Sequence, residues 1–360
     1  MKTRAALFHS PDRPLEVVEL DLEEPGPGEV LVRLAAVGVC GSDLHVVRGE
    51  WTRPTPMVLG HEGAGTVEAV GDGVTSLAPG DAVVISWAPA CGECVACRSG
   101  RRQACVPLRA AISAGTLPDG TTKLSYRGET VYRMTSTGCL SELTVLPAES
   151  ALPLGEGIPL EQAALLGCAA LTGVGAARNA ADVRPGETVL VVGAGGVGQF
   201  VVQGARMAGA SEIVCVDPNA ARLEQALALG ATAIGSPEEV ASLLPDGADA
   251  AVDAVGAPET AALSLAGTRA GGRCVVVGMP AAGARYEFDP LEFTNREKTL
   301  RGSVYGSADP ADALPGLLED VRAGRLQLAA LVGPSYPLEE ADEAFRASLA
   351  GAAGRVLVTP

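Results

Sequence analysis

Residues 187–200 read ETVLVVGAGGVGQF, a G-x-G-x-x-G pattern that lies between an apolar run and the start of a helical one. The apolar run predicts a buried β-strand, and the glycines allow a tight turn with close backbone approach. The helix that follows would offer its N-terminal N–H groups to a pyrophosphate. We therefore predict a nucleotide-binding βα turn built from Gly193, Gly195, Gly196, Val197 and Gly198.

An acidic residue ends the next apolar run, EIVCVD. This residue, Asp217, lies 19 positions beyond Gly198. A carboxylate there would accept a hydrogen bond from a ribose 2′-hydroxyl and would repel a 2′-phosphate. The sequence therefore favours NAD over NADP, and Arg222 is the nearby feature that weakens this preference.

The sequence around the glycine motif of residues 193–198, here called the fingerprint, has two parts whose apolar residues recur with different periods. From about residue 160 onward, apolar strands such as DAAVDAV and RCVVVG alternate with Ala-rich helical stretches such as ARLEQALALG. Repeated βα units imply a parallel sheet covered on both faces. Before about residue 152, short β-branched runs such as GEVLVRLAAVGV alternate with turn signals such as PGPG. We predict one β-rich domain and one α/β domain.

Charge and composition narrow the range of partners. The formal net charge of −16 repels nucleic-acid phosphates and anionic membrane surfaces, and no Lys/Arg-rich run interrupts it. The N-terminus carries charges where a secretory signal needs an apolar run, and no segment approaches about 20 uninterrupted apolar residues. We expect a cytoplasmic protein with neither nucleic acid nor membrane as a partner.

Four of the nine cysteines lie in residues 90–105, ACGECVACRSGRRQAC. Nine is an odd number in a chain without an export signal, which argues against a disulfide framework and for reduced thiolates. Four thiolates suit zinc and also iron–sulfur clusters, but the last spacing of seven differs from the three residues of the bacterial ferredoxin run. We predict that Cys91, Cys94, Cys97 and Cys105 bind a zinc ion. This ion would be structural, because four protein ligands leave no coordination position open for a substrate.

A second group of metal-binding residue types follows Cys40. Two of the three histidines of the chain, His45 and His61, lie in GVCGSDLHVVRGEWTRPTPMVLGHEGAG. Cys40, His61 and one further soft ligand would make a zinc site whose fourth position takes water or a substrate oxygen. Cys168 is the candidate third ligand, because it lies where the β-rich half gives way to the βα half. Two other cysteines lie inside predicted strands, and the last stays undecided.

These motifs together resemble the zinc-dependent alcohol dehydrogenases of the medium-chain dehydrogenase/reductase superfamily over nearly the full length. The resemblance rests on GHEGAG at 60–65, the cysteine-rich lobe, Cys168, GAGGVG and VDPNAARL. It implies a GroES-like catalytic domain of residues 1–169, completed by 305–360. It also implies a Rossmann NAD-binding domain with a doubly wound parallel sheet at residues 170–304.

The resemblance assigns roles around the open metal site. It implies that Cys40, His61 and Cys168 bind the catalytic zinc and that the Glu62 carboxylate lies beside the metal. Asp43 would orient the imidazole of His61. The chain is thus expected to bind two zinc ions, one catalytic and one structural.

The same resemblance implies a proton relay and further cofactor contacts. Ser42 would take the proton of the substrate hydroxyl and pass it through the nicotinamide ribose to His45 and solvent, while hydride passes to the nicotinamide. Thr172, Val197 and Arg355 match positions around the cofactor.

Two further features bear on binding and assembly. Gly41 stands where several family members carry a larger residue that can touch the pyrophosphate. The affinity of this chain for the cofactor is therefore expected to differ from the affinity of those members. The segment 108–138 resembles the insertion of dimeric members. We therefore expect a homodimer.

Aromatic residues make up 3% of the chain, yet Trp51 and Trp87 both fall where the resemblance puts the substrate pocket, with Leu140 as a third wall. Such a lining favours an apolar or aromatic primary alcohol, or its aldehyde. The alternative for the tryptophans is simple packing within the domain.

Three other functions stay open. The first is a formaldehyde dehydrogenase acting on a thiol adduct, in which Arg109 would bind an anion, although Glu50 is the one acid in GEWTRPTP. The second is a reductase of C=N or C=C bonds on the same scaffold. The third is a nucleotide-binding protein without catalysis, which would need neither the metal ligands nor the relay residues that this chain carries.

Overall fold

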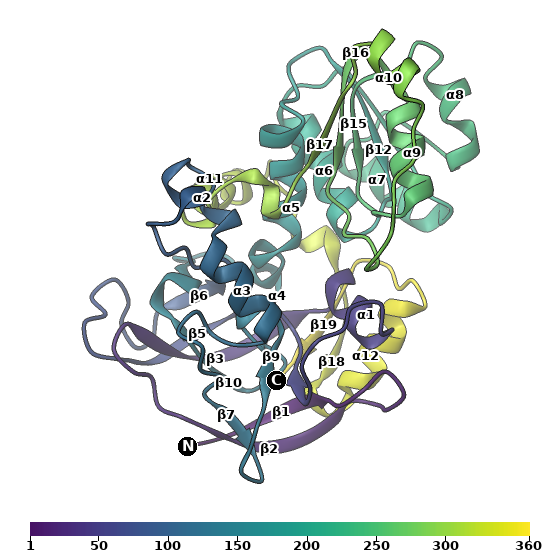
Figure 1. Cartoon of the computed structure of the whole chain (residues 1–360). Helices are drawn as coiled ribbons and strands as arrows, with labels where there is room; N and C mark the ends of the chain where they lie inside the picture. The colour runs from purple at the N-terminus through teal and green to yellow at the C-terminus, as the bar shows by residue number, and fades with distance from the viewer. The chain divides into compact units, whose positions relative to one another are not determined.

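A computed structural model describes all 360 residues of the chain (Figure 1). The chain forms two compact units. The first contains residues Met1–Cys168, Asp309–Gly324 and Leu328–Pro360, and the second contains Ala169–Ala308 and Arg325–Gln327. The C-terminal part of the chain therefore completes the unit that the N-terminal part begins.

The first unit holds two sheets, and the smaller one has six strands. Most of its pairs are antiparallel, with Lys2 opposite Asp21 in the longest ladder, whereas its last pair is parallel. Its strands in spatial order are β8 (Glu129–Thr130), β7 (Leu124–Tyr126), β2 (Glu16–Leu22), β1 (Lys2–Phe8), β4 (Met57–Val58) and β9 (Tyr132–Arg133).

The larger sheet of the first unit has seven strands, and β3 lies at its centre. β3 is almost continuously apolar and buried, as expected for a strand that has neighbours on both edges. The strands in spatial order are β11 (Ala151–Pro153), β6 (Ala82–Ile85), β5 (Glu62–Val70), β3 (Glu29–Gly38), β19 (Arg355–Thr359) and β18 (Val332–Pro337), and β10 (Leu143–Pro147) also pairs with β3.

The register at the end of β3 joins distant parts of the chain. Gly38 lies opposite Glu62 of β5 on one side and opposite Leu357 of β19 on the other. The C-terminal strand and the segment that follows His61 are therefore neighbours of the same strand end, which lies two residues before Cys40.

Short helices connect the strands of the first unit, and one apolar core joins its two sheets. In the seven-residue helix α1, Asp43, Leu44 and Val46 are buried, whereas Ser42 and His45 are half-buried. The helices of this unit are α1 (Gly41–Val47), α2 (Val95–Arg98), α3 (Val106–Ala114), α4 (Leu160–Ala163), α11 (Pro310–Arg322) and α12 (Ala341–Leu349).

The second unit is a six-stranded parallel sheet, as the repeated βα pattern predicts. Its chain order begins at a central strand, runs outward to one edge, and then returns to build the other side, which is the doubly wound order of dinucleotide-binding sheets. Its strands in spatial order are β14 (Ala233–Gly235), β13 (Glu212–Val216), β12 (Thr188–Val192), β15 (Ala248–Asp253), β16 (Thr268–Val276) and β17 (Thr299–Gly302).

Helices accompany the parallel sheet and close its own apolar core. α6 begins at the fingerprint turn, and α5 packs closely against it because Gly173 of α5 has no side chain: a Cβ there would lie 2.4 Å from the carbonyl oxygen of Val197. The helices of this unit are α5 (Ala169–Gly175), α6 (Gly196–Met207), α7 (Ala220–Leu229), α8 (Val240–Leu243), α9 (Pro258–Ala266) and α10 (Pro290–Asn295).

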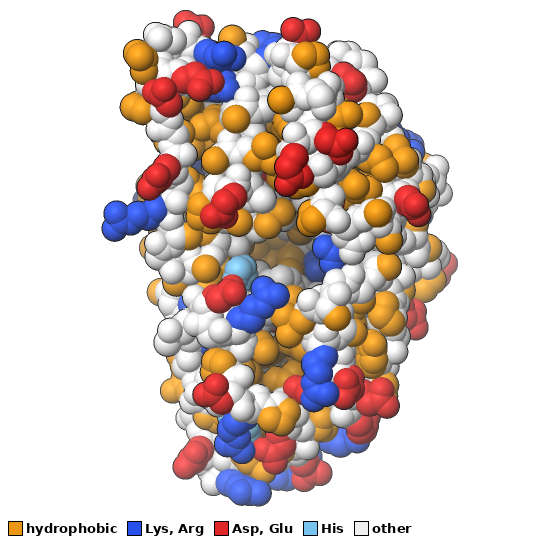
Figure 2. All heavy atoms as spheres, turned by 90° about the vertical axis from the view of Figure 1, so that its right-hand side faces the viewer, with side chains coloured by type: hydrophobic (Ala, Val, Ile, Leu, Met, Phe, Trp, Pro, Cys, Tyr) orange, Lys and Arg blue, Asp and Glu red, His pale blue; other side chains and the backbone are white.

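Neither the helices nor the surface face shown in Figure 2 has a clear feature for binding a membrane or a polyanion. No single helix has the length and apolar character to cross a membrane, although the bent pair 160–167 and 169–180 passes that test when its two parts are joined. On the face that Figure 2 shows, Lys and Arg side chains are scattered among acidic and apolar ones, without a broad basic patch.

Candidate metal centres and active site

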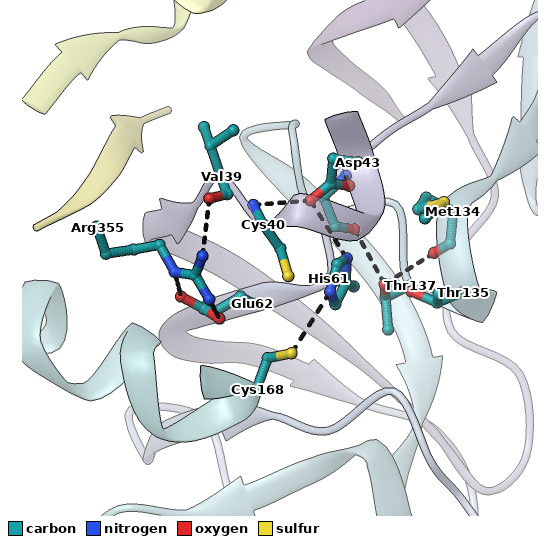
Figure 3. Close-up of polar contacts among 11 residues, drawn as sticks. Val39, Cys40, Asp43, His61, Glu62, Met134, Thr135, Thr137, Cys168 and Arg355 are labelled. Atoms are coloured by element: carbon teal, nitrogen blue, oxygen red, sulfur yellow. Dashed lines mark hydrogen bonds and ion pairs between the residues drawn. The ribbon is translucent and has the colours of Figure 1, made fainter. Parts of the chain in front are cut away.

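Three metal-binding side chains meet inside the first unit. The Sγ atoms of Cys40 and Cys168 and a ring nitrogen of His61 lie within 4.8 Å of one another, and all three residues are buried. Figure 3 shows their donor atoms pointing toward a common centre, with Cys168 Sγ 3.6 Å from His61 Nε2. Tetrahedral zinc with ordinary bond lengths needs about 3.6 Å between a sulfur and a nitrogen ligand. The three residues therefore fit a zinc ion and leave its fourth position to a non-protein ligand.

One buried carboxylate holds two of these residues in place. Asp43 is completely buried, and its Oδ2 accepts from the N–H of Cys40 at 3.1 Å while its Oδ1 accepts from the N–H of Gly60 at 2.9 Å. The same Oδ2 lies 3.4 Å from His61 Nδ1, so Nε2 is the ring nitrogen that faces Cys168. A partner on the second nitrogen fixes the orientation of a ligating imidazole. Asp43 therefore lies beside the ring nitrogen of His61 that the predicted orienting role requires.

The peptide before His61 is held from its other side. Gly60 has φ +84°, and a Cβ there would lie 2.9 Å from the backbone nitrogen of Leu140. Its carbonyl accepts from Thr137 Oγ1 at 3.1 Å and from the N–H of Cys139 at 2.9 Å. Thr137 was not identified from the sequence, and no local pattern marks it, because it lies 77 residues from Gly60.

Cys168 reaches the site because the residue before it is a glycine. A Cβ on Gly167 would lie 2.5 Å from the carbonyl oxygen of Ile85, at the end of β6. Only a residue without a side chain lets the chain pass that close to the strand. The short 3₁₀ helix Ala164–Gly167 thereby delivers the Cys168 thiol to the end of the sheet where His61 lies.

Glu62 forms a buried, bidentate ion pair with Arg355. Nε and Nη2 of Arg355 donate to the two carboxylate oxygens at 2.7 and 2.9 Å, and Nη1 donates to the carbonyl of Val39 at 3.2 Å (Figure 3). Burial raises the pKa of Glu62 to about 7, and the charge of Arg355 opposes that rise. All three guanidinium nitrogens of Arg355 therefore donate hydrogen bonds within the first unit. The contact between Arg355 and the cofactor stays a prediction.

The two cysteines of this site have opposite pKa shifts. The hydrogen bond from Cys168 holds the pKa of the Cys40 thiol well below its usual range, although burial opposes this. The same bond raises the pKa of Cys168 far above its usual range, and burial adds to the effect. Of the two thiols, Cys40 therefore gives up its proton more readily than Cys168.

The predicted relay residues share one face of α1. Ser42 and His45 are three positions apart and both are half-buried, so they lie one above the other on the helix surface. Glu50 Oε2 is hydrogen-bonded to His45 Nδ1, and the ring of Trp51 stacks on the imidazole with 4.6 Å between centroids. Neither contact of His45 was predicted. Glu50, an acidic residue five positions after His45, was the one sequence feature that could have indicated these contacts.

The residues predicted to line the substrate pocket are in three different environments. Trp51 stacks on His45, whereas Trp87 is buried with the guanidinium of Arg109 5.6 Å from its ring centroid. Leu140 belongs to the apolar core and packs against Gly60. Their part in a substrate pocket stays a prediction.

The four-cysteine lobe has the geometry of a thiolate metal site. The Sγ atoms of Cys91, Cys94, Cys97 and Cys105 all lie within 4.8 Å of one another. Two of the distances are 3.9 and 3.5 Å, close to the roughly 3.8 Å between sulfurs around tetrahedral zinc. Backbone N–H groups point at the sulfurs, and those of Val106 and Cys97 lower the pKa of Cys94 to about 6. The cluster therefore fits a structural zinc, and none of the nine cysteines forms a disulfide.

The fingerprint turn of the second unit is tightly closed. Gly193 has φ +95°, and a Cβ on Gly198 would lie 1.8 Å from the carbonyl oxygen of Gly193. A Cβ on Gly195, which caps α6, would meet nothing within 4 Å. Gly193 and Gly198 are thus needed for the turn itself, whereas Gly195 leaves open space before Gly196 and Val197, the first residues of the helix.

Asp217 is tied directly to this turn. Its Oδ2 accepts from the N–H of Ala194 and its Oδ1 from the N–H of Asn219, both at 2.8 Å. Arg222 lies in the first turn of α7, and Thr172 is a largely buried residue of α5. The structure therefore joins the predicted acid to the glycine turn, and its contact with a ribose stays a prediction.

Comparison with known proteins gives the same family from both halves of the chain. Residues 26–156 match the alcohol dehydrogenase GroES-like domain, and residues 196–321 match the zinc-binding dehydrogenase domain. An S-(hydroxymethyl)glutathione dehydrogenase of Escherichia coli O1:K1 / APEC is 36% identical over 355 residues, which cover 96% of each chain. The chain belongs to the zinc-dependent alcohol dehydrogenases of the medium-chain dehydrogenase/reductase superfamily. This confirms the predicted fold class, a GroES-like domain with a Rossmann domain, and the predicted enzyme class.

Solved structures of this dehydrogenase family have the same fold. An alcohol dehydrogenase zinc-binding domain protein from Burkholderia ambifaria is 33% identical with a TM-score of 0.94, over 100% of this chain and 99% of the other. The benzyl alcohol dehydrogenase from Acinetobacter calcoaceticus is 29% identical with a TM-score of 0.93, over the same shares of the two chains. The names of these relatives include two substrate classes, a glutathione adduct and an aromatic alcohol.

The buried ion pair of this dehydrogenase predicts a stability effect at Gly38. A Cβ there would lie 2.2 Å from Glu62 Oε1, so Gly38→Ala must displace the carboxylate from Arg355. We expect a loss of about 1 to 3 kcal/mol in stability, measured by thermal unfolding of the zinc-loaded protein. Gly41→Ala is the matched control, because a Cβ at Gly41 meets nothing within 4 Å. Equal unfolding temperatures for the two variants would contradict the prediction.

If the four-cysteine lobe binds zinc, the substitution of one of its cysteines should remove one metal ion. Cys97→Ser should reduce the zinc content from two ions to one per chain and should make trypsin cleave faster at the arginines around residue 100, because the loop is no longer held by the ion. Cys139→Ala, which removes a buried thiol outside both clusters, should keep both ions. Elemental analysis of the purified variants measures this, and two zinc ions in Cys97→Ser would refute the assignment.

The opposite pKa shifts of Cys40 and Cys168 predict how zinc binding depends on pH. Zinc needs both thiolates, and the raised pKa of Cys168 means that its proton must be displaced on binding. The apparent zinc affinity of the open site should therefore rise as the pH rises. Competition with a chromogenic chelator at several pH values measures this, and an affinity that is constant with pH would contradict it.

Proposed function

We propose that this dehydrogenase interconverts an apolar or aromatic primary alcohol and its aldehyde, with NAD as the hydride carrier. The observation that carries the proposal is the buried set of Cys40, His61 and Cys168, which leaves a metal position open. The relay residues Ser42 and His45 follow Cys40 on the same short helix. A site with an open metal position and a nearby acid–base pair suits alcohol oxidation.

The residues of the open site have separate tasks in this reaction. A zinc ion held by Cys40, His61 and Cys168 would polarise the substrate oxygen as a Lewis acid. Asp43 keeps the imidazole of His61 in the orientation that a metal ligand needs. Glu62 adds negative charge near the site, and its pairing with Arg355 compensates that charge.

The proton of the alcohol leaves through α1. The hydroxyl of Ser42 would accept it from the substrate oxygen while giving up its own proton, and His45, one helical turn further on, would pass that second proton to solvent. His45 is suited to this step because its side chain is still 18% exposed. The relay thus connects a buried metal site with the surface over one turn of helix.

We propose NAD as the nucleotide. Bound NAD would take up the hydride from the carbinol carbon. The turn between β12 and α6 has room at Gly195 and presents the N-terminus of α6 to a pyrophosphate. The negative charge of Asp217 beside that turn disfavours a 2′-phosphate.

The preference for NAD predicts the effect of removing that charge. Asp217→Ser should lower kcat/KM for NAD and raise it for NADP, because the repulsion of the 2′-phosphate disappears. Initial rates with both nucleotides measure the ratio, and Glu224→Gln, an exposed acid further along α7, is the control. An unchanged ratio in Asp217→Ser would remove this residue from nucleotide selection.

We also propose that residues 1–169 and 305–360 act as the catalytic domain, residues 170–304 bind the nucleotide, and the enzyme is a homodimer. The dimer rests on the segment 108–138, which here contains much of α3 and the strands β7 to β9. Light scattering of the zinc-loaded protein measures the mass directly.

The aromatic alcohol is supported by the two tryptophans and by the similarity to a benzyl alcohol dehydrogenase. A second candidate substrate is the hydroxymethyl adduct of a small anionic thiol. It is supported by the relatives that are named S-(hydroxymethyl)glutathione dehydrogenase. It is also supported by Arg109, a cation that forms no ion pair with a carboxylate. Its guanidinium donates to the carbonyl of Gln103 at 3.4 Å and lies 5.6 Å from the centroid of the Trp87 ring.

Substrate assays with the zinc-loaded enzyme and NAD decide between the two substrates. We expect turnover of benzyl alcohol without any thiol, and Arg109→Ala should leave that rate within about twofold because the substrate is uncharged. Turnover only with formaldehyde and glutathione, with a large rise of KM in Arg109→Ala, would favour the adduct instead. No turnover in either assay would contradict both substrates.

A further inference from the structure

The chain directly after α1 folds back onto His45. The N–H groups of Glu50 and Trp51 both donate to the carbonyl oxygen of His45, at 2.9 and 3.1 Å. Gly49 makes the turn with φ +71°, and a Cβ there would lie 3.1 Å from Pro11 Cγ. The backbone of these two residues is therefore fastened to the residue whose side chain they contact.

Both side chains then return to the imidazole ring. Glu50 Oε2 is hydrogen-bonded to His45 Nδ1, and Oε1 of the same carboxylate lies 4.0 Å from Arg48 Nη1. The indole of Trp51 lies nearly parallel to the imidazole, with 17° between the planes and 4.6 Å between the centroids. The guanidinium of Arg53 lies 5.5 Å from the centroid of the Trp51 ring. The imidazole is thus held by one edge and one face.

The chemistry of the partner decides which ring nitrogen carries the proton. An ionised carboxylate can only accept a hydrogen bond, so Nδ1 must be the donor. In the neutral imidazole the other nitrogen, Nε2, is then the acceptor. The stacked indole opposes rotation of the ring, which would exchange the two nitrogens.

We propose that Glu50 and Trp51 are positioning residues of the proton relay: together they hold the His45 imidazole with Nδ1 protonated, so that Nε2 exchanges the relayed proton. This inference rests on the relay role of His45 in the proposed function. A proton that arrives at Nε2 gives an imidazolium beside the Glu50 carboxylate, and loss of that same proton to solvent restores the neutral ring. The Nδ1 proton stays in place throughout.

The chain contains a natural control for this arrangement. His9 is also paired with a glutamate, but through Nε2, at 3.1 Å from Glu16 Oε2. Glu16 is the first residue of β2 and takes no part in the Glu50–His45 contact. Glu16→Gln therefore disturbs the other His–Glu pair and leaves the Glu50 carboxylate in place.

Nitrogen NMR of the zinc-loaded full chain, labelled at histidine, tests the tautomer directly. Only three imidazoles contribute, and His45→Gln assigns the signals of His45 by their loss. We expect the neutral ring of His45 to be protonated at Nδ1, and Glu50→Ala should shift it toward the Nε2-protonated form. Glu50→Gln, whose amide oxygen still accepts, should restore much of the original pattern, and Glu16→Gln should change only His9. A neutral His45 protonated at Nε2, or identical His45 signals in Glu50→Ala, would overturn the proposal.

A double-mutant cycle tests whether Glu50 acts through His45. Glu50→Ala should lower kcat by roughly tenfold while KM for the alcohol stays within about twofold, and Glu50→Gln should recover part of the loss. In the His45→Gln background, Glu50→Ala should have no further effect. An equal loss in both backgrounds would overturn the positioning role. If His45→Gln alone leaves kcat unchanged, the relay of the proposed function fails, and the NMR signals still decide whether Glu50 sets the tautomer.

Discussion

The pairing of β3 with β5 and β19 is the constraint on which the candidate active site depends. β5 lies along one edge of β3 and β19 along part of the other, and Gly38 is opposite a residue of each. This register places Glu62 beside Arg355, 293 residues away, and leaves Cys40 two residues after the shared strand end. A shift of one residue would turn these side chains to the opposite face of the sheet. The metal site is therefore a consequence of sheet register.

Three carboxylates close together in the sequence behave differently because their surroundings differ. Asp43 is fully buried and accepts from the backbone on both sides of the site, so it acts as a structural anchor. Glu62 is equally buried, but a guanidinium compensates its charge. Glu50 is 33% exposed and meets the one half-buried histidine of α1. The residue type alone would not distinguish these functions, whereas burial and the identity of the partner do.

The two metal centres differ in how they are encoded. All ligands of the four-cysteine lobe lie within residues 91–105, so their spacing alone indicates a common ion. The open site draws on Cys40, His61 and Cys168, and the last of these arrives through the close passage of Gly167 beside β6. A local loop can be recognised by spacing, whereas a site assembled across a sheet needs either the fold or a family resemblance to be recognised.

The sequence alone determined the division into a β-rich and an α/β part, the fingerprint turn, the acid after its second strand and the metal-binding residue types, because these signals are periodicities and spacings within short segments. Only the tertiary structure decided that Arg355 pairs with Glu62, that Thr137 holds the carbonyl of Gly60, and that Trp51 lies on His45. The first two of these contacts join residues far apart in the chain, and the third depends on the turn at Gly49. They follow from strand register and backbone conformation, which no local sequence pattern specifies.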